Sequence, residues 1–246
     1  RLLVIAKEAD APVMVVHLTN QKAYEEVIAA RKNGQTIYAE TCPQYLLLDD
    51  SVYSKPDFQG AVYVCAPPIR KKEDQECLWK ALADGEIQTV ATDQCSFTLA
   101  QKALGKDDFT KIPGGLPGVQ TRGTLLYTYG VETGKITREQ MCALLSENPA
   151  RLYGVYPRKG VIRPGSDADI VVFDPEKENV ISAKTHAYNT DNNPFEGFEL
   201  HCGIDKVFLR GHLAVTGGKI AEEKLGTFIP REKNRFQERN INEKTN

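Results

Sequence analysis

The sequence lacks the patterns that mark several large classes of protein. No stretch approaches the roughly 20 consecutive apolar residues that a membrane-spanning helix needs, and the first residues lack the apolar core and small-residue cleavage site of a signal peptide. No GxGxxG or P-loop pattern is present, which disfavours a nucleotide-binding open sheet. We therefore expect a protein that neither inserts into a membrane nor carries a nucleotide-binding motif.

Cysteine is scattered, and charge of one sign is not in excess. None of the six Cys residues forms the CxxC pair of a structural zinc site or redox motif, which favours a reduced, cytoplasmic protein. The formal net charge is -2 and the isoelectric point is near 6.2, so no basic field attracts nucleic acid. A small neutral or anionic partner fits this balance better.

What is present is the composition of an ordinary globular protein. Hydrophobic residues make up 41% and charged residues 26% of the 246 positions, enough for one large core or two modest ones. The first residue is Arg1, and the opening LLVIAKEADA is typical of the middle of a helix. We therefore expect further residues before Arg1.

Strand and helix patterns alternate in the first part of the chain. The apolar run at 13–18 is typical of a buried parallel strand, and Thr19 and Asn20 are suited to cap a helix after it. A strand, a helix and a strand in this order imply a parallel sheet, either a (β/α)8 barrel or an open doubly wound sheet. The same patterns predict a helix up to about residue 33, strands at 36–41, 61–65 and 86–92, and helices at 72–83, about 118–130 and 138–149.

After the segment NPARLYG at 148–154, the sequence consists of short β-rich segments separated by Gly, Pro and Asp. This pattern predicts a small antiparallel sheet. We expect three regions: a barrel part at 1–159, a β-rich part at 160–220 and a polar C-terminal tail at 221–246. Within the tail, residues 231–246 are typical of a solvated segment or of one that orders only on assembly.

Two polar residues directly follow buried strands. In a parallel barrel the carboxyl ends of the strands line one mouth, so His17 and Asp93 are candidate metal ligands there. Read singly, a histidine that ends a strand is more often a structural residue. An aspartate in this place is more often a turn or helix cap. Position alone leaves the functional and the structural interpretations both open.

Seven ordered blocks run through the sequence: VVHLTN, ETCPQYLLLD, CAPPIRKKEDQ, VATDQCSF, ALGKDDFTKIPGGLPGV, NPARLYGVYPRKG and GSDADIVVFDP. Together they resemble the hydantoinase and dihydropyrimidinase branch of the amidohydrolase superfamily. ETCPQYLLLD looks most like bacterial hydantoinases, including phenylhydantoinases, whereas ALGKDDFTKIP is shared with dihydropyrimidinases. The resemblance implies the C-terminal half of a (β/α)8 metal-dependent hydrolase barrel, followed by part of a β-sandwich that both ends of a longer chain build.

By the same resemblance, His17 closes the sixth barrel strand and Asp93 the eighth. The family's centre holds two divalent metal ions, in our interpretation Zn2+, bridged by a carboxylated lysine that is not in this chain. An HxH pair and one more histidine complete it, and neither can be identified here. The remaining histidines fall in the β-rich part, where we interpret them as surface or sheet-packing residues: His186, His201 and His212.

The resemblance further implies hydrolysis of a cyclic amide, the opening of a hydantoin or dihydropyrimidine ring to an N-carbamoyl amino acid, by a homotetramer or dimer. Asp93 then both binds metal and carries a proton to the ring nitrogen. The family holds its substrate through main-chain groups, here at Ala66 and Gly114, where a Ser and an Asn are often found. A packing turn without a ligand is the alternative for both. Gln94 stands where hydantoinases commonly have His and dihydropyrimidinases Asn, and we expect this difference to bear on the choice of substrate.

Three alternatives remain at this stage. Some relatives of dihydropyrimidinase have lost the metal ligands and act as non-catalytic scaffolds, and retention of His17 and Asp93 argues against that role. ETCPQYL and KDDFTKIP argue against the allantoinase or dihydroorotase branch. A third alternative is an inactive piece without its N-terminal ligands.

Cys65 and Cys95 lie beside expected strand ends, and without a base partner we interpret them as buried small hydrophobic residues.

Overall fold

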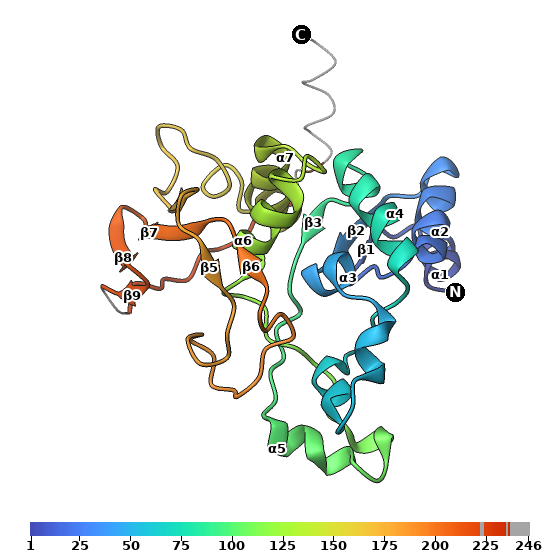
Figure 1. The fold of residues 1–246 in the computed structure, drawn as a ribbon. Helices are drawn as coiled ribbons and strands as arrows, with labels where there is room; N and C mark the ends of the chain where they lie inside the picture. Colours follow the sequence, from blue (N-terminus) through green and yellow to red (C-terminus); the bar gives the residue numbers. More distant parts are fainter. Residues whose placement is uncertain (222–223, 235, 237–246) are drawn as a thin grey trace.

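A parallel sheet of three short strands organises the first part of the fold. The computed structural model describes residues 1–221, 224–234 and 236. Strands that follow one another in the chain are neighbours in the sheet, without the reversal of order found in doubly wound sheets, which favours the barrel (Figure 1). The strands are β1 (Val13–Val15), β2 (Ile37–Thr41) and β3 (Thr89–Val90).

Two helices, α1 (Leu2–Glu8) and α2 (Gln21–Lys32), accompany β1 and β2. The side chain of Asn20 accepts a hydrogen bond of 3.0 Å from the amide of Ala23, so it caps α2 as expected. At the other end of α2, Arg31 donates from Nε to the carbonyl of Ile37 and from Nη2 to the Gln88 side chain. These bonds fix α2 against both β2 and the approach to β3.

The predicted strand at 61–65 is wrong. Residues Gln59–Tyr63 form a 3-10 helix after Phe58, whose φ of 65° turns the chain. The amide of Ala61 donates to the carbonyl of Phe58, and that of Val64 to the carbonyl of Ala61, so these groups are used locally instead of in a ladder. Ala61 and Tyr63 are buried all the same. Around this segment lie α3 (Pro43–Leu47), a 3-10 turn at Asp50–Ser54 and α4 (Lys72–Ala83).

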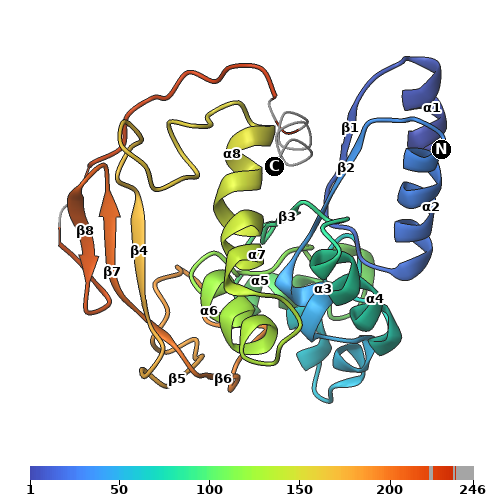
Figure 2. The ribbon, with the colours of Figure 1, turned by 90° about the horizontal axis from the view of Figure 1, so that it is seen from above.

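Helices α6 to α8 lie between the parallel sheet and an antiparallel sheet in both ribbon views (Figures 1 and 2). On one side Asn148 donates to the carbonyl of Gln88, and on the other the Tyr127 ring stacks on Phe173 at 6.0 Å. The helix predicted at about 118–130 begins later, at Arg122. The amides at 118 and 119 donate instead to the Gln94 side chain. The segments are α6 (Arg122–Leu126), a π-helical turn at Tyr127–Val131, α7 (Arg138–Cys142), a second such turn at Ala143–Glu147, and α8 (Asn148–Leu152).

The C-terminal part is β-rich and antiparallel, as predicted. One sheet has the order β4-β7-β8-β9, and β5 pairs with β6. The boundaries at 159/160 and 220/221 stay predictions. Their strands are β4 (Ile170–Asp174), β5 (Asn179–Val180), β6 (Glu199–Leu200), β7 (Gly203–Leu209), β8 (His212–Thr216) and β9 (Lys219–Ile220).

The segment expected to be a solvated tail contacts the rest of the chain where the structure describes it. The amide of Glu232 donates to the carbonyl of Gly154 at 2.7 Å, and the Phe236 ring meets Tyr38 of β2 edge to face at 5.3 Å. Residue 235 and residues 237–246 lie outside the described part. The segment therefore contacts the rest of the chain at Glu232 and Phe236, and the polar tail as a region stays a prediction.

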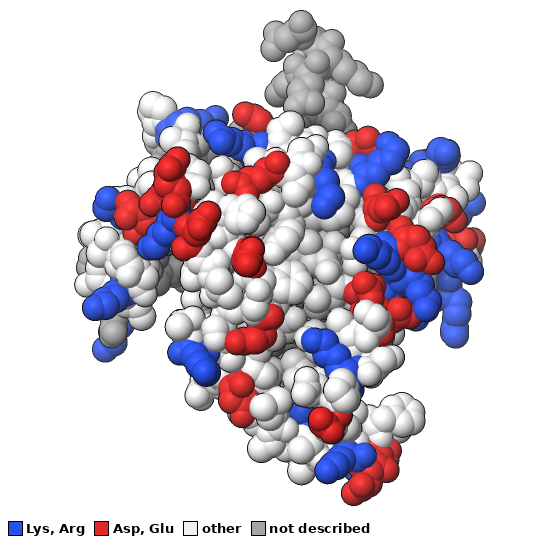
Figure 3. Space-filling model, in the orientation of Figure 1, with Lys and Arg blue, Asp and Glu red and all other residues white. Residues whose placement is uncertain are grey.

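Acidic and basic side chains are interspersed on the face shown in Figure 3, over the helical side and over the β-rich side, with a largely uncharged band between. No described helix has the length and apolar character needed to cross a membrane. The buried core includes apolar residues of α2, α4 and α6 together with residues of β2 and β3.

Candidate metal and substrate site

The structure brings His17 and Asp93 together. Nε2 of His17 lies 3.8 Å from Oδ2 of Asp93, and their side chains are 29% and 50% exposed. His17 follows β1 and Asp93 follows β3, so the two outer strands of the parallel sheet deliver them from either side of β2. An imidazole and a carboxylate thus share one partly shielded rim at the carboxyl ends of the strands.

The buried Thr41, at the end of β2, holds both segments. Its hydroxyl donates to the carbonyl of Leu18 at 2.8 Å, and its own carbonyl accepts from the amide of Ala91 at 2.9 Å. The amide of Leu18 in turn donates to the carbonyl of Glu40. The residue after His17 and the residue two before Asp93 are therefore fixed on the same end of β2.

Both candidate ligands have left-handed backbone conformations. The φ angle is 42° at His17 and 51° at Asp93. Such angles are uncommon outside glycine and cost of order 1–3 kcal/mol, and they gather at functional sites. Five other non-glycine residues also have positive φ angles, so the angles are compatible with a functional pair but do not by themselves distinguish it from two ordinary strand ends: Asp10, Asp57, Phe58, Arg210 and Lys224.

The chemistry of the pair fits a divalent metal, but the number of ligands is incomplete. A neutral imidazole and a carboxylate are both suited to zinc, which takes three or four protein ligands. Within the described part of the chain, no group of three or more His, Cys, Asp or Glu side chains could hold an ion. Two other histidines have protein partners: the ring of His186 contacts the carbonyl of Thr190, and His201 lies 3.0 Å from Glu132.

Ala66 and Gly114 also lie side by side. A Cβ atom built on Gly114 would be 3.8 Å from Cα of Cys65 and 3.9 Å from the amide of Ala66. The peptide bond between Ala66 and Pro67 is cis, and the Tyr45 hydroxyl donates to the Pro67 carbonyl. The turn that carries Gly114 is joined to the loop after Asp93, because the amide of Cys95 donates to the carbonyl of Leu116 at 3.1 Å.

No motif marks Lys102, yet its side chain is 2% exposed beneath this turn. Its ammonium group donates to the carbonyls of Val64, Pro113 and Gly115 at 2.9, 2.7 and 3.0 Å. Burial lowers the pKa of Lys102 to about 8. Lysines are ordinarily solvated, and this one lies in a sequence with other lysines nearby, so the residue pattern does not distinguish it.

The remaining polar residues near the site have structural contacts. Oε1 of Gln94 accepts from the amides of Gly118 and Val119, which makes it a brace of the following loop. Cys65 is half-buried with its thiol against the Pro67 carbonyl, and burial raises its pKa, which disfavours a thiolate nucleophile. Cys95 is exposed, so its interpretation as a buried residue is wrong.

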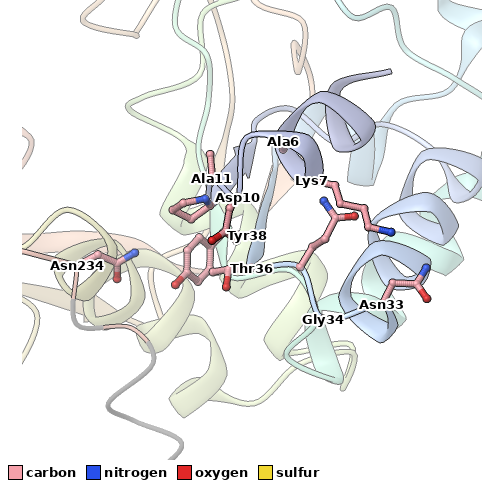
Figure 4. A pocket seen from close by; sticks show the side chains of 11 residues that line it. Ala6, Lys7, Asp10, Ala11, Asn33, Gly34, Thr36, Tyr38 and Asn234 are labelled. Atoms are coloured by element: carbon pink, nitrogen blue, oxygen red, sulfur yellow. The ribbon is translucent and has the colours of Figure 1, made fainter.

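A hollow of about 440 Å³ lies at the opposite end of the sheet (Figure 4). Its lining includes Ala11 and Pro12 before β1, Thr36 before β2, and Asn234. These residues are at the amino ends of the strands, whereas His17 and Asp93 follow the carboxyl ends. The hollow is therefore separate from the candidate ligands.

Comparisons with known proteins identify the family of the chain and its fold. A model of the amidohydrolase family matches residues 1–214. The D-hydantoinase of Geobacillus stearothermophilus is 44% identical over 227 residues, which are 92% of this chain and 48% of that protein. A solved D-hydantoinase (dihydropyrimidinase) from Thermus sp. superposes with a TM-score of 0.92 at 40% identity, over 96% of this chain and 52% of the other.

The solved dihydropyrimidinase of Brevibacillus agri gives a TM-score of 0.87 at 45% identity, over 89% of this chain and 48% of that one. The chain spans about half the length of the relatives that it matches.

Proposed function

Because the chain belongs to the amidohydrolase family, we propose that it forms part of a metal-dependent hydrolase that opens a cyclic amide, a hydantoin or a dihydropyrimidine, to an N-carbamoyl amino acid. Its fold is that of half a (β/α)8 barrel followed by part of a β-sandwich, as predicted. The observation that carries the proposal is the approach of His17 to Asp93 at 3.8 Å. The relatives' names, D-hydantoinase and dihydropyrimidinase, supply the substrate class.

Opening an unstrained amide near neutral pH needs an activated water, a polarised carbonyl and a proton for the departing nitrogen. His17 and Asp93, together with ligands from outside these residues, would hold a divalent metal, which would activate the water and polarise the carbonyl. Asp93 supplies the third, since its half-exposed carboxylate can take a proton from water and pass it to the ring nitrogen. His17 contributes a neutral imidazole ligand.

The ring is held by main-chain groups in this proposal. An imide edge presents carbonyl acceptors on either side of an N–H donor, and a pair of adjacent backbone segments can match that order. Ala66 and Gly114 provide such a pair, because their segments lie in contact. Recognition through the backbone also accounts for the tolerance of Ala and Gly where Ser and Asn are often found.

We further propose two Zn2+ ions bridged by a carboxylated lysine from outside this chain, a homotetrameric or dimeric assembly and a cytoplasmic location. Two observations support parts of this set. The described ligands, one imidazole and one carboxylate, are of the types that zinc binds. All six cysteines are free, which fits a reducing compartment.

A non-catalytic scaffold with the same fold is the competing function. Such a protein has no need of an imidazole and a carboxylate that converge at the carboxyl ends of two strands. The joint retention and convergence of His17 and Asp93 therefore favour the enzyme.

The proposal is tested on the complete protein that contains this chain. Hydantoin and dihydrouracil are supplied in turn, and the N-carbamoyl product is measured before and after removal of metal by a chelator, and again after Zn2+ is restored. We expect loss and recovery of ring opening. A His201→Gln variant, which alters a histidine remote from the site, serves as control and should keep full activity. Absence of product from both rings in the metal-loaded protein would contradict the proposal.

A further inference from the structure

The buried ammonium group of Lys102 is surrounded by neutral oxygen atoms. Its three donors meet three carbonyls, those of Val64, Pro113 and Gly115, at 2.7 to 3.0 Å. The Phe97 ring lies 5.6 Å away, and among the described residues no carboxylate forms an ion pair with Lys102. A charge buried without a counter-ion is costly, so this arrangement calls for an explanation beyond packing.

The three carbonyls come from the two segments that the proposed function uses to hold substrate. Val64 precedes Cys65 and Ala66, while Pro113 and Gly115 flank Gly114. The amide of Gly115 also donates to the carbonyl of Val64 at 2.9 Å. Lys102 therefore joins the two segments through their main chains, independently of their side chains.

The lysine approaches from a well-anchored element. It ends the short helix α5 (Leu99–Lys102), which begins with a reciprocal cap between Thr98 and Gln101. The amide of Leu99 donates to Asp191 at 2.8 Å, from the loop between β5 and β6. Because both the start of the helix and the ammonium group are fixed, the side chain spans a defined distance beneath the turn.

We propose that Lys102 is a positioning residue that holds the Gly114 peptide in register with Ala66 and strengthens the Gly114 N–H as a donor to a ring carbonyl; this inference rests on the proposed function. The Pro113 carbonyl and the Gly114 N–H belong to one peptide unit. A charge-assisted bond to the carbonyl draws electron density from that unit and makes its N–H a stronger donor. A neutral side chain would hold the turn but would not polarise it.

A purely structural role predicts a different outcome. If Lys102 only stabilises the fold, its loss lowers the thermal midpoint and leaves the affinity of the remaining folded enzyme for substrate unchanged. A residue that improves ground-state and transition-state binding equally affects KM and leaves kcat alone. The split between KM and kcat therefore separates the two roles.

The experiment uses Lys102→Met in the complete protein, since Met has a similar length and no donor. Lys159→Met is the matched control, because Lys159 is mostly buried, pairs with Asp167 and Asp169, and lies in the connection between α8 and β4. Steady-state kinetics are measured with hydantoin and with dihydrouracil, together with metal content and hydrogen exchange of the peptide around residues 112–117.

In K102M we expect KM to rise about tenfold or more, in line with loss of one good hydrogen bond, with kcat and metal content kept. Exchange at 112–117 should be faster in K102M and unchanged in K159M. A KM equal to that of the wild type, an equal rise in K159M, or unaltered exchange would overturn the inference.

Should K102M not fold, Lys102→Gln, which keeps two donors without the charge, takes its place. We expect its KM to rise by less than tenfold, and no rise would overturn the inference. Failure of the wild type to open either ring would instead refute the proposed function, while the exchange comparison would still decide whether Lys102 holds the turn.

Discussion

Nε2 of His17 and Oδ2 of Asp93 are 3.8 Å apart although they end different strands of the parallel sheet, and the strand between them supplies the bonds that hold both. Thr41 is completely buried and uses its hydroxyl for one side and its carbonyl for the other. The approach is therefore built into the sheet and does not depend on flexible loops.

In the complete protein, Asp93→Asn should lower kcat for ring opening on the order of 10³-fold, because an amide cannot carry the proton to the ring nitrogen. The kcat values for hydantoin and dihydrouracil provide the measurement. Asp84→Asn, which removes an exposed partner of Lys80, should leave kcat unchanged. Near-normal turnover by D93N would remove Asp93 from the mechanism.

A polypeptide of these 246 residues alone should bind well below one metal ion per chain, since its described residues bring only two ligands together. Metal content after dialysis against Zn2+ and then against buffer provides the measurement. The complete protein, treated in the same way, is the reference and should retain metal. Stoichiometric retention by the shorter polypeptide would show that two ligands suffice.

Gly114 and Gly115 should respond very differently to alanine. A Cβ on Gly114 meets only ordinary contacts, whereas one on Gly115, where φ is 151°, would lie 2.3 Å from the carbonyl oxygen of Cys95. We expect Gly115→Ala to cost of order 1–3 kcal/mol and to raise KM through displacement of the turn. Gly114→Ala should change neither the free energy of unfolding nor KM by much. Thermal unfolding and steady-state kinetics distinguish the two, and equal effects would contradict the contacts described.

Gly154→Ala should displace the segment around residue 232. The φ angles of Gly154 and Gly134 are 69° and 72°, so alanine carries a similar left-handed penalty at both, about 1 kcal/mol. Only at Gly154 would the new Cβ meet a neighbour, the carbonyl oxygen of Glu232 at 2.0 Å. Limited proteolysis should cleave the C-terminal segment faster in G154A than in G134A. Equal cleavage would mean that this contact does not hold the segment.

The stability of the wild type relative to K102M should rise with pH above 8. Burial lowers the pKa of Lys102 from 10.5 to about 8, so between these values the unfolded chain holds a proton that the folded chain lacks. Unfolding then takes up a proton, and the free energy of unfolding increases with pH across this window. Urea midpoints of the two proteins, compared at pH values on either side of 8, provide the measurement. If the difference between the two urea midpoints did not change with pH, the pKa of Lys102 in the folded protein would not lie between about 8 and 10.5.

Strand ends and helix caps could be predicted because they depend on local chemistry. The run before His17, the cap at Asn20 and the pattern that leads to Asp93 each have a physical meaning within a few residues. The segment at 61–65 misled because a short apolar run is equally compatible with any buried backbone. With that strand removed, β1, β2 and β3 can serve as the sixth, seventh and eighth strands that the resemblance implies.

The contacts that complete the site are non-local and leave no pattern in the sequence. Lys102 reaches carbonyls at 64, 113 and 115, and acceptors on the main chain have no residue signature. The contact of Phe236 with Tyr38 likewise joins an apparently polar tail to a strand far away in the chain. Only the folded backbone reveals such partners.

The left-handed backbone at His17 and Asp93 also restricts how this site can change during evolution. Asn, Asp, His and Gly tolerate such angles better than β-branched and bulky residues do. If selection for catalysis were relaxed in a descendant, substitutions at these two positions would still be filtered by the backbone. Asn or Gly would be the common replacements there, so a lineage that has lost activity would keep a recognisable trace of the former ligands in its conformation.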